Sequence, residues 1–165
     1  MSHRALCIPE IVAMICEAGV YLEDYEFNWN TLTSLARTCK AFQDPALDVL
    51  WSSQSTMMNV LKCMPGDIWE WPDENEVAVE LQRPIIPTDW ERPFFYAHRV
   101  KRFDNSLDVQ YGRLFYETLQ MCLPGEPLFP NLQSMNWTSE NDGVLFPYLR
   151  SFLGPRLRTL TLDVD

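Results

Sequence analysis

The side chains that most often carry out proton transfer or nucleophilic attack are sparse in this sequence. It has two histidines, His3 near the terminus and His98 in an Arg-rich stretch at the end of a predicted helix, where a cation interacts favourably with the helix dipole. A Cys–His nucleophile pair would need a cysteine beside one of them. We expect no catalytic residues, and that pair is the alternative. The five cysteines are Cys7, Cys16, Cys39, Cys63 and Cys122.

Metal and phosphate sites also lack their usual spacings. The cysteines are odd in number and scattered, and no C-x-x-C pair provides the close spacing that chelates zinc. The acidic run at 73–76 does not have the spacing of a calcium-binding loop. With only six glycines, the chain has neither of the glycine-rich patterns that cradle phosphates. The sequence therefore predicts no enzyme, no cofactor and no metal site.

The charge balance bears on the partners that the chain can bind. It has 13 basic and 23 acidic residues among 165, for a formal net charge of -10. An acidic surface repels nucleic-acid backbones and anionic membranes, so we expect neither nucleic acid nor a membrane as a partner. A local basic patch at Arg99, Lys101 and Arg102 would be the exception, and such a run is ordinarily a solvated face.

The cysteines and the N-terminal segment indicate a reducing compartment. Several cysteines lie on apolar stripes, where a reduced cysteine acts as a small hydrophobe. The apolar run after Arg4 could be a signal peptide, but Pro9, Glu10 and Glu17 interrupt it and its apolar positions have helical spacing. No uninterrupted apolar stretch approaches roughly 18 residues, so no membrane span is expected. We therefore expect a cytoplasmic or nuclear protein.

Helical periodicity dominates the N-terminal part of the chain. Ile8, Ile11, Val12 and Ile15 recur at i, i+3, i+4 and i+7, which is one face of an amphipathic helix. Pro9 suits the first turn of that helix, where its missing N–H costs nothing.

Further helices are predicted before the texture of the sequence changes. Asn30 can cap a second helix that runs to Cys39. Asp44 can cap a third, with Pro45 at its first position, and a fourth ends before residue 65. Residues 1–62 are therefore predicted to form one helical domain. The inward positions of the third helix are predicted to be Leu47, Leu50 and Trp51.

The remaining sequence alternates between extended and helical patterns. Residues 63–76 are acidic and rich in turn formers, and we interpret them as a linker between domains. Residues 77–165 are interpreted as an α/β segment, because repeated strand–helix–strand order implies parallel strands joined by crossover helices. The extended segments are 77–81, 100–105, 131–137 and 157–165, and the helical ones are 88–100, 111–123 and 142–153.

The extended segments resemble one another. Taking Val79, Phe103, Met135 and Leu160 as equivalent positions, the gaps are 24, 32 and 25 residues. Two gaps fall in the range of leucine-rich repeats, and the middle one needs an insertion, for which 123–130 is the best place. The fold class predicted is thus α+β: an all-helical N-terminal domain followed by the start of an α/β leucine-rich-repeat solenoid with short parallel strands. An ordinary small α/β sandwich is the alternative.

Two features of the N-terminal half resemble the F-box family. "IPEI" at 8–11 is similar to the Leu-Pro-x-Glu-Ile type opening of that family, with isoleucine in place of the usual leucine. "LARTCKAFQDPALDVLW" at 35–51 has Cys39 at a cysteine-like position and closes on a Leu-Trp pair, Leu50 and Trp51. The segments "CMPGDIWE" and "RPIIPTDWERPFFYAHRV" resemble F-box proteins of mushroom-forming fungi, so the resemblance covers nearly the whole chain.

The resemblance implies a helical adaptor that docks on a Skp-family adaptor protein, and through it on a cullin, within a ubiquitin ligase. Three short helices cannot easily bury all their apolar side chains among themselves, so some should stay open to a partner. Large apolar and aromatic side chains usually carry the energy of an interface. For Trp51 the alternative is a place in the seam between the F-box and the repeats. The adaptor-binding residues expected are Ile8, Pro9, Ile11, Ile15, Leu47, Leu50 and Trp51.

The repeat half would then bind a protein substrate, which the sequence does not identify. Parallel strands of such repeats line a face that binds proteins. No capping unit follows the strand at 157–165, so we expect a truncated member of a longer family whose free edge self-associates through Leu157, Leu160 and Leu162. The alternative function is a leucine-rich protein-binding module with a non-docking F-box remnant and no ligase role.

Overall fold

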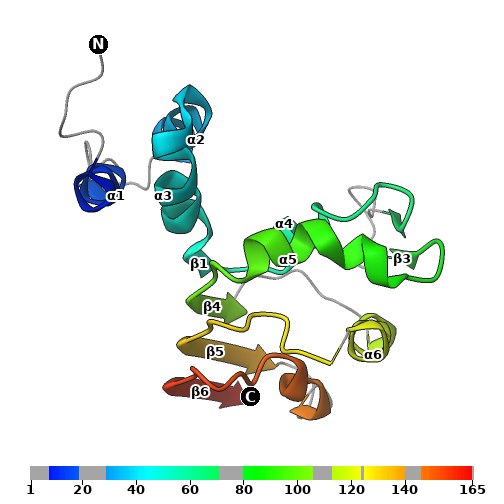
Figure 1. The fold of residues 1–165 in the computed structure, drawn as a ribbon. Coiled ribbons are helices and arrows are strands. Elements are labelled where there is room, and N and C mark those ends of the chain that lie inside the picture. Colours follow the sequence, from blue (N-terminus) through cyan, green and yellow to red (C-terminus); the bar gives the residue numbers. More distant parts are fainter. Residues whose placement is uncertain are drawn as a thin grey trace. The chain divides into compact units, whose positions relative to one another are not determined.

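The structure, a computed structural model, divides into two compact units, Met1–Ser53 and Gln54–Asp165, each of which is described by itself (Figure 1). The predicted order of helices first and a mixed α/β region second is confirmed. His3, Cys7, the acidic run at 73–76 and the strand expected at 77–79 lie outside the residues that the structure describes. Those residues are 8–18, 29–70, 80–105, 113–123, 125–139 and 146–164.

The first unit is a bundle of three helices. Helix α1 (Pro9–Ala18) opens with a proline, and the N–H groups of Ile11 and Val12 both bond to the carbonyl of Ile8 at 3.1 Å. Helices α2 (Trp29–Thr38) and α3 (Lys40–Trp51) follow, and α3 packs against both of the others. The fully buried side chains of the bundle are Val12, Cys16, Leu32 and Ala46, with Leu35, Ala36, Phe42, Val49 and Leu50 packed around them.

The start predicted for the third helix was wrong. The structure begins α3 at Lys40 and places Pro45 inside it, instead of at its first position. The reason is that the Cys39 carbonyl already accepts the N–H groups of Phe42 and Gln43, at 3.1 and 3.2 Å, and so forms a helical turn before Asp44. Pro45 then removes one main-chain bond without ending the helix.

The second unit is built on a four-stranded sheet with the order β1-β4-β5-β6 (Figure 1). The strands are β1 (Ser53–Gln54), β4 (Arg102–Asn105), β5 (Ser134–Ser139) and β6 (Thr159–Val164). The β4–β5 and β5–β6 pairs are parallel. Helical segments form the crossovers, as the alternating pattern predicted: α6 (Arg113–Cys122) lies between β4 and β5, and the 3-10 helix η4 (Phe146–Ser151) lies between β5 and β6.

The register predicted from the sequence is confirmed for three strands. Phe103 pairs with Met135, and Met135 pairs with Leu160. Phe103 and Met135 are fully buried, so this row lies on the core face of the sheet. Strands that match in this way despite gaps of 32 and 25 residues show that the crossovers, not the strands, absorb the difference in length.

The equivalence of the first extended segment with the others was wrong. Its described part, β3 (Glu80–Leu81), pairs antiparallel with β2 (Trp69–Glu70) in a separate two-stranded sheet, and the neighbour of β4 is β1 instead. The buried residues Ile68 and Trp69 explain this arrangement, because they draw β2 into the core and β3 pairs with it. Part of the segment interpreted as a linker thus packs in the second unit.

The remaining helices of this unit precede β4. The short helix α4 (Met58–Leu61) contacts α5 (Glu91–Ala97), which continues directly from the 3-10 helix η3 (Pro87–Trp90). Pro93 is the third residue of α5, in the first turn, where the sequence required it.

Aromatic side chains fill the space behind the sheet. Phe152 stacks on Phe103 with ring centroids 5.5 Å apart, and it also lies 5.5 Å from Trp137. Phe129 joins both Phe103 and Phe152, and Tyr116 of α6 reaches Trp137 at 5.7 Å. All five side chains are at most 2% exposed, so they form the centre of the second unit.

Candidate functional site

Helix α1 has one apolar face turned into the bundle and a second turned outward. Val12 and Cys16, one helical turn apart, are at most 1% exposed. Ile8 and Ile15 are 44% and 38% exposed, and Ile11 between them is half-buried. Positions i, i+3 and i+7 lie on one side of a helix, so these three isoleucines form a stripe beside the buried face. The outward stripe is not needed to close the core.

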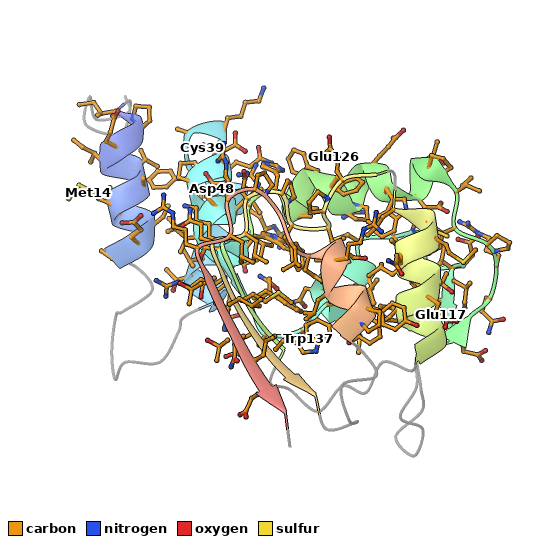
Figure 2. All side chains as sticks on the ribbon, turned by 90° about the horizontal axis from the view of Figure 1, so that it is seen from below. Met14, Cys39, Asp48, Glu117, Glu126 and Trp137 are labelled. Atoms are coloured by element: carbon orange, nitrogen blue, oxygen red, sulfur yellow. The ribbon has the colours of Figure 1, made fainter. Side chains whose placement is uncertain are left out.

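Met14 extends this stripe and was missed in the sequence. It is 67% exposed, and Figure 2 shows it projecting from α1. Its position three residues after Ile11 was the signal that could have found it. Pro9 is also exposed at the start of the helix. We call the outward residues Ile8, Ile11, Met14 and Ile15 the α1 stripe.

The predicted residues of α3 are less open than those of α1. Leu47, Leu50 and Trp51 are all half-buried, and Leu50 packs against the core of the bundle. The fully buried residue on this helix is Ala46. Both groups of predicted residues belong to the unit Met1–Ser53, in which α1 packs against α3.

Carboxylates lie on the same helices as these apolar residues. Glu10 and Glu17 are exposed on α1, and Asp44 and Asp48 are exposed on α3, where Figure 2 labels Asp48. A protein interface commonly has an apolar centre and a polar rim, and its rim charges favour partners of opposite sign. The bundle therefore suits a partner with apolar pockets bordered by basic side chains.

Comparison with known proteins assigns nothing to this surface. The chain matches no protein-family model, no curated protein and no solved structure. Its function is therefore inferred from the α1 stripe and from a second surface, the outer face of the sheet.

The outer face of the four-stranded sheet is polar. Asp104 of β4 accepts a hydrogen bond from Nδ2 of Asn136 on β5, at 3.2 Å. The other amide atom of Asn136, Oδ1, is buried and has no hydrogen-bond partner among the described residues. This face presents hydroxyl, amide and charged groups that can bind a polar peptide surface. Its two rows are Arg102, Ser134, Thr159 and Asp104, Asn136, Thr161.

The potentially reactive side chains contact their own main chain. Nδ1 of His98 lies 3.0 Å from the carbonyl oxygen of Phe94, and the Cys63 thiol donates to the Asn59 carbonyl at 3.3 Å. Burial raises the pKa of the Cys63 thiol, against a smaller opposing effect of the Arg92 charge. A thiol with a raised pKa is a poorer nucleophile at neutral pH.

Two further searches bear on cofactors and membranes. In the part of the chain that the structure describes, His, Cys, Asp and Glu residues form no group of three or more that could hold a metal ion. Over the same residues, every helix is too short or too polar to cross a membrane.

The basic run does not form one continuous patch. Lys101 and Arg102 are exposed, but Arg99 is only 8% exposed, and its guanidinium lies 5.3 Å from the centre of the Phe95 ring. Arg99 is thus partly a packing residue of α5, and the surface charge of the run is smaller than its sequence indicates.

The clearest electrostatic feature of the second unit is a bridge from Arg83 to two carboxylates. The Arg83 guanidinium bonds to Asp67 through Nε at 2.7 Å and to Asp89 through Nη1 at 2.7 Å. Asp89 also accepts the N–H of Ile86 at 2.9 Å. The hydrogen bonds from Arg83 are the main cause that holds the pKa of both carboxyl groups below the ordinary value. These contacts tie Asp67, before β2, to the segment after β3, which is a structural role.

Proposed function

We propose that the chain is a non-enzymatic adaptor whose helical unit is an F-box that docks a Skp-family adaptor protein of a cullin ubiquitin ligase. The observation that supports this most is the α1 stripe, an outward apolar face on a helix whose opposite face already closes the core. Exposed isoleucine and methionine side chains in one row are the kind of surface that a partner buries.

The small size of the bundle supports the same proposal. Its helices span 10, 10 and 12 residues, and its fully buried apolar side chains are few. Burying one large aliphatic side chain contributes about 1.5–3 kcal/mol, so the stripe holds back several kcal/mol that docking would recover. Under this proposal Pro9 and the half-buried Leu47, Leu50 and Trp51 border the same interface.

The second unit is proposed as the substrate-binding half, the beginning of a leucine-rich-repeat solenoid. The row Phe103–Met135–Leu160 and the gap of 25 residues support a repeat, and the polar outer face of the sheet supports protein binding. Cytoplasmic or nuclear localisation belongs to this proposal, as does the lack of a cofactor, of nucleic acid and of a membrane among its partners. The competing function is a protein-binding module whose helical unit does not dock.

The test is a double substitution on the α1 stripe, Ile8→Glu with Ile15→Glu. Both side chains are exposed, so the bundle should keep its circular dichroism and melting temperature. Affinity for a purified Skp-family adaptor, measured by calorimetry, should fall by at least about 100-fold, because two apolar anchors are lost. The matched control is Met121→Glu with Leu153→Glu, at residues 85% and 45% exposed in the other unit, and it should bind normally. Equal binding by both variants, or no binding by the unmodified chain, would overturn the proposal and favour the competing module.

A further inference from the structure

The last strand of the sheet, β6, exposes the residues that continue its buried rows. Leu160 pairs with Met135 and Leu162 pairs with Trp137, and both partners are fully buried. Leu160 and Leu162 are nevertheless 41% and 45% exposed. In the sheet order, β6 is the terminal strand, so these two leucines are covered by a neighbouring strand on one side only.

The main chain of β6 is open at the same two residues. The N–H of Thr159 bonds to the carbonyl of Gln133 on the β5 side, at 3.0 Å. Bonding direction alternates along a parallel strand, so Thr159 and Thr161 bond toward β5 and the N–H and C=O groups of Leu160 and Leu162 point to the free edge. Polar main-chain groups and apolar side chains are therefore presented together, which is a template for another strand.

We propose that this edge binds β6 of a second copy of the chain, antiparallel, about a two-fold axis at Thr161. In that register Leu160 lies opposite Leu162 of the second copy, and each exchanges both main-chain hydrogen bonds with the other. Because Leu160 and Leu162 both have outward main-chain groups and both point to the core face, the strand is complementary to itself. The two small sheets would become one, with the four leucines side by side on one face.

The charges of β6 favour this direction over a parallel one. The strand follows the exposed Arg158 and carries the exposed Asp163 near its end. Antiparallel pairing brings the basic start of one copy beside the acidic end of the other, and it places Thr159 directly opposite Asp163 of the second copy. Parallel pairing would bring like charges together at both ends, which is unfavourable for residues across a strand pair.

The first experiment uses cysteine cross-linking of the full chain. Thr161 would face its own copy in a non-hydrogen-bonded pair, with Cα atoms about 4.5 Å apart, which suits a disulfide. Thr161→Cys should therefore form a disulfide-linked dimer with oxidised glutathione. Ser134→Cys, on the same sheet face but on the central strand β5, should cross-link no more than the unmodified chain. Equal cross-linking of the two variants would overturn the proposal, as would a monomeric mass for the unmodified chain at every soluble concentration in sedimentation equilibrium.

The second experiment tests the direction of pairing by the sign of an effect. T159K would add a cation opposite Asp163 of the second copy and should tighten self-association by about fivefold, because the symmetry uses the pair twice. T159E would add a like charge there and should weaken it by a similar factor. In a parallel arrangement residue 159 faces its own copy, so both variants would weaken association, and that result would overturn the antiparallel pairing. Neither outcome depends on whether the helical unit docks an adaptor.

Discussion

The guanidinium of Arg83 and the carboxylate of Asp89 meet through two hydrogen bonds, Nη1 to Oδ2 at 2.7 Å and Nη2 to Oδ1 at 3.0 Å. The Asp89 side chain is only 5% exposed, so this fork–fork contact is shielded on the carboxylate side. A two-pronged contact fixes direction as well as distance. It holds the start of η3 against the strand that precedes it.

Replacing Asp89 by asparagine should destabilise the second unit. The neutral amide of asparagine is not a charged acceptor, so D89N leaves a partly buried cation without its counter-charge and should lower the free energy of unfolding by about 1–3 kcal/mol at pH 7. Urea unfolding monitored by tryptophan fluorescence would measure the loss. Glu126→Gln, at an exposed carboxylate, is the control and should change little.

The same contact predicts how stability depends on acid. Arg83 lowers the pKa of Asp89 and Asp67 in the folded chain below the ordinary 3.8, so unfolding raises both pKa values and takes up protons. The stabilisation is complete above about pH 4 and is lost as the pH falls through the folded pKa values. Urea midpoints of the unmodified chain and D89N should therefore converge below pH 3.8. A constant difference between them down to that pH would contradict this cause.

Met14 should affect adaptor binding without affecting stability. Its side chain is 67% exposed, so Met14→Ala removes almost no core packing. If the α1 stripe docks a Skp-family adaptor, the loss of this anchor should weaken binding by about tenfold, measured by calorimetry. Glu17→Gln, on the same helix, is the control for a polar change. Unchanged affinity in Met14→Ala would restrict the docking surface to the three isoleucines.

The cysteines should react with a thiol reagent in order of exposure. Cys39 is exposed and should be alkylated first, followed by the half-buried Cys122 and Cys63. Burial, with a smaller contribution from Glu17, raises the pKa of Cys16, which should react only after unfolding. Timed alkylation and mass spectrometry would give the order, and should find all five thiols reactive in the unfolded, unreduced chain. A disulfide would contradict the reducing compartment expected from the sequence.

Removing the Phe152 ring should be costly. It is fully buried between Phe103 and Trp137, so Phe152→Ala should lower the free energy of unfolding by about 3–5 kcal/mol. Its neighbour Leu153 is 45% exposed, and Leu153→Ala should cost about 0.5 kcal/mol or less. Similar losses in the two variants, measured by urea unfolding, would show that the aromatic cluster does not form the centre of this unit.

The sequence predicted best where one local pattern settles the structure. The row Phe103–Met135–Leu160 follows from similar apolar spacings in three strands, and pairing them in register buries the most apolar surface. The apolar face of α1 follows in the same way from helical periodicity. Which of its apolar residues stay outside was harder, because that depends on how much surface α3 covers, and Met14 was missed for this reason.

The errors arose where distant segments compete for a partner. Local alternation around Val79 resembled the later strands, but β3 pairs with β2, and β2 is placed by the burial of Trp69. Likewise, Asp44-Pro45 is a sound helix start by itself, and the Cys39 carbonyl simply begins the turn earlier. Neither competition is visible in a short window of sequence.

The unequal crossovers have a consequence for how this chain tolerates insertions. Strands β4 and β5 stay in register across a longer stretch than β5 and β6, so length added between two strands need not shift a row. Doubling a flexible loop costs only about 0.6 kcal/mol of closure entropy. Gly125 and Glu126 are exposed in the longer crossover, and Gly125 already adopts a left-handed turn with φ of 85°. An epitope placed between them should leave the sheet intact, whereas an alignment that assumes a fixed period would misplace every strand after it.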